Sequence, residues 1–479
     1  MNTESLFKKC IAGKRKNAIT GNIVFSYNVS PYIVYCEFFA PHNEKDKISE
    51  FQKLLFEQGK EHELNVYDKM FDGVRPIVYE TEEEGFLFAL DEFFKGAKII
   101  SNSPLFYFAE GLKGRPDLLE KRKGGSVFGN HHYVVYEIKS AKNIKKKHVM
   151  QACFYNYVIG KIQGYIPEHF YLINREMKEY KYSYGEYKDE LLKQITEIKE
   201  IINGKKISPI YNVEWPWSEY SKKKAIESND VTLVSGIGEI AKAKLANAGI
   251  KTVNGLLKSS RIKGISEGSL QKWKLSAKAL SSGKHIVISK PRFPSAKTEI
   301  FFDFEGAPDI GNGDEIIGID YLIGCLVNVH GKEKYIPFVA RNTAEEEKMF
   351  KNFVKFISSK KDYVLYHYAS YETTHLKKLA VKYNVNVDEI LKHMVDLLSV
   401  VRASVVFPTH SNSIKEVAPY IGFRWRQENF KGDDSIALYL EYLKDKNKSK
   451  LAKIINYNED DVRATLALKK WLERISVVE

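Results

Sequence analysis

Two proline-containing segments divide this sequence into three parts. The first is Trp215-Pro216-Trp217-Ser218, which a charged stretch from Glu219 to Asp230 follows, and the second is Lys290-Pro291-Arg292-Phe293-Pro294-Ser295. Proline removes a backbone donor and disfavours helix at the residue before it. A chain of 479 residues also exceeds one ordinary core, because domains typically hold ~100–200 residues. We therefore predict an α/β multidomain protein with domains at 1–217, 231–285 and 297–479.

The charge of the chain suits a polyanionic partner. Its formal net charge is +13 and its pI is about 9.1, and Lys and Arg can displace condensed counterions from nucleic acid. Membrane surfaces, acidic proteins or a merely solvated Lys-rich surface fit the charge as well. A hydrophobic content of 44% excludes a disordered or fibrous chain.

The cysteines and the apolar runs indicate an intracellular setting. Four scattered cysteines show no paired spacing for zinc or a disulfide framework: Cys10, Cys36, Cys153 and Cys325. Met1 to Asn17 lacks the apolar core of a signal peptide, and no run approaches the ~18 apolar residues of a spanning helix. We expect a cytoplasmic protein that does not bind membranes.

The first part alternates helical and extended patterns. Helices are predicted at Phe51–Phe71, Val149–Ile159 and Asp189–Ile202. A strand is predicted at Tyr133–Lys139, after a turn-prone stretch from Glu120 to His132. This is a mixed α/β pattern.

Acidic residues and a lysine stand together in this part. Asp117 follows Gly114-Arg115-Pro116, and Glu137 and Lys139 point to the same face of the predicted strand. Two carboxylates can hold one or two Mg²⁺ ions, while the lysine positions or helps to deprotonate an attacking water. Surface Glu-x-Lys pairs on strands are common, so the spacing alone favours a solvated pair.

Neighbouring residues support the metal interpretation. Gln151 and Tyr155 are four apart on a predicted helix and share a face beside the acids. His62, in Gly59-Lys60-Glu61-His62-Glu63, could supply an imidazole ligand, although a lone helical histidine is more often a surface or satisfied residue. These motifs, in this order, resemble the RecB-type branch of the PD-(D/E)xK nucleases over roughly the first 210 residues.

The resemblance implies a restriction-endonuclease-like fold and a role for each motif residue. His62, Asp117 and Glu137 would bind metal, Lys139 would be catalytic, and Gln151 and Tyr155 would contact nucleic acid beside the site. Some relatives carry an iron–sulfur cluster held by one cysteine before the His-Glu helix and three after the Gln-x-x-x-Tyr helix. Cys36 could match the first, but no cysteine cluster follows Tyr155, so no iron–sulfur cluster is expected.

The middle part is small and helical. Val234-Ser235-Gly236-Ile237-Gly238-Glu239 resembles a helix-hairpin-helix motif, in which a Gly-x-Gly turn lets backbone N–H groups approach a phosphate. The resemblance assigns Gly236 and Gly238 to nucleic-acid binding, without base readout. A weaker echo begins at Lys263-Gly264-Ile265-Ser266. A plain helical spacer with capping glycines is the alternative.

The third part opens on a strand that carries two acids. In Ile300-Phe301-Phe302-Asp303-Phe304-Glu305-Gly306 both carboxylates share one face, with aromatic residues on the other. Burying them without partners or a cation is costly, so a metal site is the economical explanation. Further strands are predicted at Ile316–Val329 and Lys334–Val339, and helices at Ala344–Ser358, Tyr371–Tyr383 and Asn458–Ile475.

Two later motifs complete this set. Glu372 is a third acid, and Tyr457 and Asp461 share a helical face. A simpler explanation is that Glu372, Asp460 and Asp461 are acids in the first turn of a helix, where the helix dipole favours negative charge. The set resembles the RNase H-like DEDD 3′–5′ exonucleases with tyrosine in the last motif, over roughly 297–479. The resemblance implies that Asp303, Glu305, Glu372 and Asp461 bind metal and that Tyr457 orients water. The second motif of these exonucleases usually carries Asp, and this chain has Glu372 there. Asp396 is a candidate auxiliary acid near the site.

The complete chain resembles a family of RecB-like nucleases of unassigned substrate. We therefore expect a Mg²⁺- or Mn²⁺-dependent DNA nuclease with two active sites, acting on single strands or duplex ends in repair, recombination or foreign-DNA processing. A helicase or repair protein would be a partner, as RecB-type domains often work with one. The alternatives are a 3′–5′ exonuclease that processes RNA and a non-catalytic nucleic-acid-binding scaffold.

Overall fold

The computed structural model describes every residue except 1, 14, 311–316, 429 and 476–479. The chain forms two compact units: the first contains Met1–Lys47 and Leu55–Lys223, and the second contains Ile48–Leu54, Lys224–Gly311 and Ile316–Glu479. The helical segment at 231–285 thus belongs to the same unit as the C-terminal sheet. Among the described residues, no helix is long and apolar enough to cross a lipid bilayer.

A five-stranded sheet forms the centre of the first unit, in the order β2-β5-β6-β7-β8. Its strands are β2 (Ile99–Ser101), β5 (Leu118–Ser126), β6 (Gly129–Ile138), β7 (His169–Ile173) and β8 (Glu179–Ser183). Only β6 and β7 are parallel neighbours within this sheet. Parallel neighbours need a long crossover, and α6 (Lys146–Gln163) provides it.

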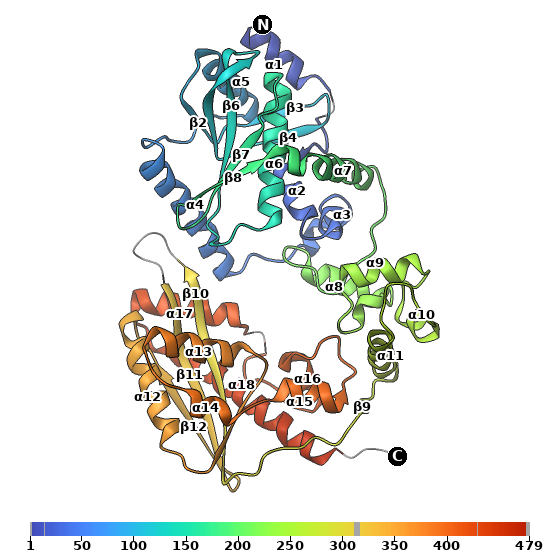
Figure 1. The fold of residues 1–479 in the computed structure, drawn as a ribbon, viewed down its shortest axis with the longest axis vertical. Helices are drawn as coiled ribbons and strands as arrows, with labels where there is room; N and C mark the ends of the chain where they lie inside the picture. Colours follow the sequence, from blue (N-terminus) through green and yellow to red (C-terminus); the bar gives the residue numbers. More distant parts are fainter. Residues whose placement is uncertain (1, 14, 311–316, 429, 476–479) are drawn as a thin grey trace. The chain divides into compact units, whose positions relative to one another are not determined.

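Helix α6 is the core helix of this unit (Figure 1). Nearly all of its residues are buried, because the sheet, α2 (Gly21–Tyr27) and α7 (Tyr184–Ile202) contact it. A small sheet adds β1 (Ile19–Thr20), β4 (Leu112–Gly114) and β3 (Leu105–Tyr107). The remaining helices are α1 (Thr3–Ile11), α3 (Pro31–Phe39), α4 (Glu50–Met70), α5 (Glu82–Lys95) and α8 (Ser218–Glu227).

The expectation of a turn-prone stretch from Glu120 to His132 is wrong for most of its length. These residues form the paired ends of β5 and β6, which meet in a hairpin. The charged and glycine-rich composition suggested turns. Strand pairing depends on backbone hydrogen bonds, which charged side chains do not prevent. An antiparallel pair also tolerates solvent on a polar face, and most residues of this half of β5 are exposed or half-buried.

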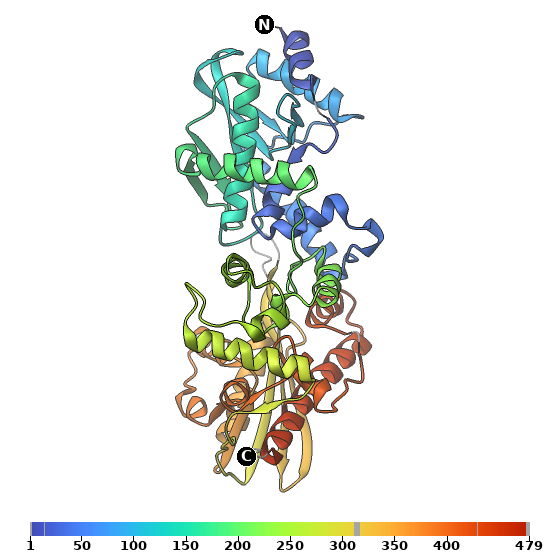
Figure 2. The ribbon, with the colours of Figure 1, turned by 90° about the vertical axis from the view of Figure 1, so that its right-hand side faces the viewer.

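The second unit begins with short helices. These are α9 (Glu239–Asn247), α10 (Val253–Lys258) and α11 (Glu267–Ser282), drawn in yellow-green (Figure 1, Figure 2). They join the C-terminal part through β9 (Ile286–Val287), which pairs with β15 (Val405–Val406). The imidazole of His285 contacts the Tyr420 hydroxyl at 2.9 Å. The helical segment is therefore packed on the rest of this unit.

A second five-stranded sheet follows, in the order β12-β11-β10-β13-β14. Its strands are β10 (Thr298–Ile310), β11 (Ile317–Val329), β12 (Lys332–Val339), β13 (Tyr363–His367) and β14 (Met394–Asp396). The first three form an antiparallel meander, and β13 and β14 add in parallel. The sequence predicted the second strand from Ile316, a residue outside the described set.

Helices cover this sheet. They are α12 (Glu346–Ser358), α13 (Tyr371–Lys382), α14 (Asp388–Lys392), α15 (Leu397–Ser404), α16 (Ile414–Tyr420), α17 (Gly432–Asp445) and α18 (Lys448–Arg474). The last, α18, packs against β10 and β11 (Figure 1). It begins at Lys448, where Asn447 caps the first turn, rather than at Asn458, and its earlier part buries Leu451 and Ile454. Tyr457 and Asp461 therefore lie in the middle of a helix.

Candidate functional site

The first unit brings Asp117, Glu137 and Lys139 together. Asp117 precedes β5, while Glu137 lies at the end of its neighbour β6. The Asp117 carboxylate accepts a hydrogen bond from the Ile138 backbone N–H at 2.6 Å, and the Lys139 ammonium donates to Glu137 at 2.7 Å. All three side chains line a cavity of about 670 Å³. The strand pair thus sets their mutual distances.

The electrostatics of this cavity favour a bound cation. Burial, then the charge of Glu137, raises the pKa of Asp117 well above its ordinary value, and burial also raises the pKa of Glu137. Burial alone would lower the pKa of Lys139, but the two carboxylates raise it. Glu137 is 2% exposed, and its Oε2 has no hydrogen-bond partner among the described residues. An unpartnered buried carboxylate oxygen fits a hard divalent cation.

Gln151 and Tyr155 lie beside the acids on α6, and both line the same cavity. The Gln151 amide donates to Asn22 Oδ1 at 3.1 Å and to the Tyr155 hydroxyl at 3.3 Å. The Tyr155 ring fills the space next to Gly21, where a Cβ atom would lie 2.3 Å from it. The N-terminal turn of α2 therefore packs on this side of the cavity.

The long helix α4 contributes an acid that the sequence motifs did not single out. Glu63 lines the cavity and hydrogen-bonds the Tyr67 hydroxyl, which also donates to the Asp117 carbonyl at 3.2 Å. The preceding residue, His62, is not among the lining residues and is 1% exposed. Burial lowers the pKa of His62, which keeps the imidazole neutral. The pairing of Glu63 with Tyr67, one helical turn apart, was the available signal.

The glycines of the helical segment occupy turn positions. Gly236 has a φ of +87°, in the left-handed region that favours glycine, and Gly238 is the N-cap of α9. The weaker second motif, which begins at Lys263, has the same form: Gly264 has a φ of +79°, and Ser266 caps α11. The structure thus contains two similar turns that lead into helices.

The second unit assembles the other acids. Carboxylate oxygens of Asp303, Glu305 and Asp461 all lie within 4.8 Å of one another. The first two come from β10 and the third from the middle of α18. Glu372, in the first turn of α13, is 3% exposed and hydrogen-bonds Asp303. Four acids from three elements therefore converge, and the mid-helix position of Asp461 rules out its explanation as a first-turn charge.

Burial, with a further contribution from neighbouring carboxylates, raises the pKa values of these acids. Burial, followed by the charges of Glu372 and Asp461, raises the pKa of Asp303 well above its ordinary value. Burial raises the pKa of Glu372 to about 7, and it raises that of Asp461 although Lys415 opposes the shift. Such a cluster fits one or two divalent cations, which would replace repulsion with coordination.

Two residues that the sequence motifs missed contact Asp461. The Lys415 ammonium and the Trp425 indole N–H both donate to its Oδ1, the latter at 2.6 Å. Lys415 also lies over the rings of Trp425 and Tyr457, at 4.4 and 4.3 Å from their centroids. Tyr457 is 3% exposed and hydrogen-bonds Asp461, so it lies at the acid cluster.

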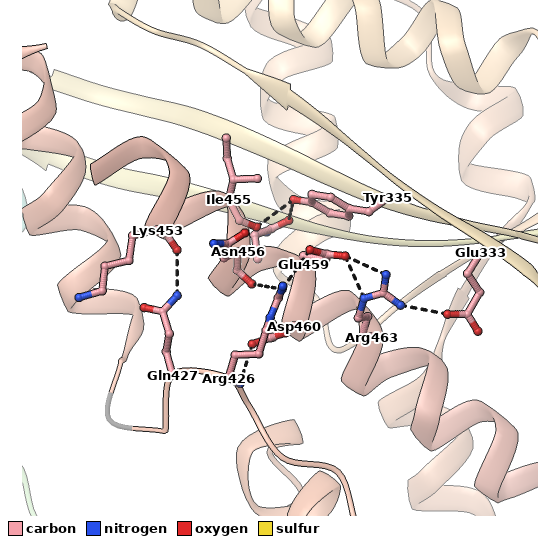
Figure 3. Close-up of polar contacts among 11 residues, drawn as sticks. Glu333, Tyr335, Arg426, Gln427, Lys453, Ile455, Asn456, Glu459, Asp460 and Arg463 are labelled. Atoms are coloured by element: carbon pink, nitrogen blue, oxygen red, sulfur yellow. Dashed lines mark hydrogen bonds and ion pairs between the residues drawn. The ribbon is translucent and has the colours of Figure 1, made fainter. Parts of the chain in front are cut away.

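The segment that carries Trp425 is tied to α18. Figure 3 shows the Arg426 guanidinium donating to Asp460 at 2.7 Å, to Glu459 at 3.0 Å and to the Asn456 carbonyl at 2.8 Å. Arg463 in turn joins Glu459 to Glu333 of β12. This network holds the segment in place beside Asp461.

Asp396 has a local structural role. Its carboxylate caps α15 by accepting from the Leu398 N–H at 2.9 Å, and it also accepts from the Ala369 N–H at 2.9 Å and the Ser399 hydroxyl. These contacts account for the residue without a metal.

Comparison with known proteins identifies the domain that holds the second site. Residues 300–473 match the model of a family described as RNase_H superfamily. The C-terminal part of the chain is an RNase H-like domain. This confirms the fold predicted for that part.

Similarity to solved structures extends over part of the chain. One of these structures is the family B DNA polymerase from the hyperthermophilic archaeon Pyrobaculum calidifontis, with 17% identity and a TM-score of 0.28. The match covers 47% of this chain and 34% of the polymerase chain, so this chain spans about a third of the length of that protein. No curated protein matches the chain.

Proposed function

We propose that this protein is a metal-dependent nuclease that hydrolyses phosphodiester bonds of DNA at two sites. The observation that carries the proposal is the convergence of Asp303, Glu305 and Asp461 within an RNase H-like domain. Carboxylates so close and so buried repel one another in the absence of a cation. Their arrangement therefore favours the binding of a cation.

In the second site, Asp303, Glu305, Glu372 and Asp461 would hold Mg²⁺ or Mn²⁺, which supplies Lewis-acid activation of water and charge neutralisation at the scissile phosphate. Tyr457 orients the attacking water through its hydroxyl. The surrounding helices exclude bulk solvent from the acids, since Glu305 and Glu372 are 7% and 3% exposed.

In the first site, Asp117, Glu137 and Glu63 would provide the carboxylates, and His62 remains a predicted ligand. Lys139 positions the water and offsets phosphate charge, because its ammonium is held against Glu137 at 2.7 Å. Gln151 and Tyr155 line the same cavity, where a nucleic-acid strand would lie. A PD-(D/E)xK fold for 1–217 and a helix-hairpin-helix contact to phosphates by Gly236 and Gly238 complete the proposal.

End-labelled oligonucleotides test this assignment. Lys139→Ala and Asp303→Ala should each remove one of two product ladders, and the double variant should be inactive in Mg²⁺ and Mn²⁺. Lys188→Ala and Asp388→Ala remove exposed charges of the same types and should retain both ladders. Cleavage by the double variant at the parent rate would refute both sites.

The same assay distinguishes this proposal from the second candidate function, a 3′–5′ exonuclease that degrades RNA. The RNase H superfamily match is equally compatible with DNA and with RNA as the substrate. Degradation of labelled RNA in preference to single-stranded and duplex DNA would establish it. Tight binding without cleavage in Mn²⁺ would instead indicate a nucleic-acid-binding scaffold.

A further inference from the structure

We propose that Asn458 is a positioning residue that holds the carboxylates of Asp303 and Glu305 in the orientation needed for metal binding. This inference rests on the proposed function of the second site. Asn458 lies between Tyr457 and Asp461 on α18 and is fully buried, at 0% exposure. Its role follows from three sets of contacts.

The first set joins Asn458 to the acids. Its amide nitrogen donates to Asp303 Oδ2 at 2.8 Å. Asn458 and Ser435 also hydrogen-bond Glu305, and the Ser435 hydroxyl is itself held by the Tyr321 hydroxyl at 2.8 Å. A neutral donor stabilises a carboxylate in one rotamer without competing as a cation would. Both acids of β10 are therefore fixed from the same side.

The second set fixes the orientation of the Asn458 amide. The Tyr335 hydroxyl donates to Asn458 Oδ1 at 2.9 Å, with a second contact to the Ile455 carbonyl at 3.4 Å that Figure 3 shows. An asparagine amide has one accepting end and one donating end. Because the phenol of β12 occupies the accepting end, the NH₂ group must face Asp303.

The third contact explains a glycine inside a strand. Gly324 of β11 pairs directly with Asp303 of β10. A Cβ atom at Gly324 would lie 1.7 Å from Asn458 Oδ1 and 2.7 Å from the Tyr335 hydroxyl. Glycine weakens a strand interior and marks a close approach by another group. Here the approaching group is the Asn458 amide, which therefore needs this glycine to reach Asp303.

Together, β10, β11, β12 and α18 each contribute one part of this device. Asp303 would bind the metal, and Asn458 donates a hydrogen bond to its carboxylate. Tyr335 orients the Asn458 amide, and Gly324 leaves room for that amide. Loss of such an outer contact typically lowers metal affinity by about 10–100-fold. Asn458 acts through the acids and does not need to touch the substrate.

Mn²⁺ binding by the full-length protein tests the inference. An Asp117→Ala background removes the first site, so that titrations followed by Mn²⁺ electron paramagnetic resonance report on the second. Asn458→Ala should weaken Mn²⁺ binding at least tenfold. Asn456→Ala changes an exposed asparagine on the same helix and should leave binding unchanged. The rise in melting temperature on adding Mn²⁺ should shrink for Asn458→Ala, which a merely structural role would not cause.

Gly324 supplies a second, compensatory test. Gly324→Ala should destabilise the fold, and adding Asn458→Ala should recover part of the loss in melting temperature, because the closer of the two clashes is gone while the Tyr335 hydroxyl still lies 2.7 Å from the new Cβ. Mn²⁺ affinity of that double variant should stay at the weak level. If Asn458→Ala does not fold, Tyr335→Phe provides the same test. It removes only the hydroxyl that orients the Asn458 amide, and it should also weaken Mn²⁺ binding.

The outcomes separate this inference from the proposed function. The positioning role would be overturned if the Mn²⁺ affinity of Asn458→Ala, or of Tyr335→Phe in its place, lay within twofold of that of Asn456→Ala. If Asp303→Ala leaves Mn²⁺ binding in the same background unchanged, the second site does not bind metal, and the proposed function of that site fails with the inference.

Discussion

Glu372→Gln should stabilise the metal-free protein at alkaline pH while it abolishes function at the second site. Glu372 is 3% exposed and hydrogen-bonds Asp303. Glutamine has nearly the same shape, and its amide oxygen can accept from a protonated Asp303 as the Glu372 carboxylate does. The substitution therefore removes a titrating charge with little change in packing.

The size of the effect follows from the pKa of Glu372. Burial raises it from its ordinary 4.5 to about 7 in the folded chain. A carboxyl with a raised pKa loses stability as pH increases from its unfolded value through its folded value. At about 1.36 kcal/mol for each pKa unit, the cost above pH 7 is roughly 3 kcal/mol. It is small near pH 5, where the folded group keeps its proton.

Urea unfolding in EDTA at pH 5 and pH 8 measures this difference. Relative to the parent, Glu372→Gln should gain about 3 kcal/mol at pH 8 and under about 1 kcal/mol at pH 5. The charge of Glu372 also raises the pKa of Asp303, so its removal eases the ionisation of Asp303 and adds to the gain at pH 8 in the same direction. Glu389→Gln, an exposed glutamate on α14, should show no such gain. A difference that is the same at both pH values would refute the reasoning.

Three further predictions concern metal and packing. Mn²⁺ should reverse the order of stability of the parent and Glu372→Gln at pH 8, as melting curves with saturating metal would show, because glutamine removes a charged ligand. Gly21→Ala places a Cβ 2.3 Å from the Tyr155 ring; we expect at least tenfold slower cleavage by the first site in product-ladder assays, whereas Gly125→Ala, with no atom within 4 Å, should cleave normally. Lys242→Met removes the ammonium that lies 2.7 Å from buried Asp230 and should cost about 3–5 kcal/mol of unfolding free energy, most of which Asp230→Asn should restore; equal stability in urea would count against a buried ion pair.

Local sequence patterns predicted the parts of each site that lie on one element. Glu137 and Lys139 follow from alternation on a strand, and Asp303 with Glu305 follows from the same rule on β10. The RNase H-like domain was predicted because its acids occur in a recognisable order. These features need only the periodicity of a strand or helix.

Contacts between distant residues were not predictable in this way. Lys415 and Trp425 reach Asp461 across 46 and 36 residues of sequence, and no periodicity links them. On α4 the sequence indicated His62, yet Glu63 lines the cavity, because adjacent helical residues point about 100° apart and only tertiary packing decides which one faces the cavity. Gly324 could be explained only after Asn458 was seen beside it.

The two sites place a lysine among their acids in different ways, and this has a consequence for metal binding. Lys139 lies two residues after Glu137, just past the end of β6, so its ammonium remains near the acids whichever group they bind. Lys415 comes from a separate helix and donates to the same Asp461 oxygen as Trp425. A cation that coordinates this oxygen competes with the Lys415 ammonium, which already lies over the rings of Trp425 and Tyr457. Lys415→Met should therefore bind Mn²⁺ more tightly at the second site in the Asp117→Ala background; weaker binding would show instead that Lys415 supports the metal-bound arrangement.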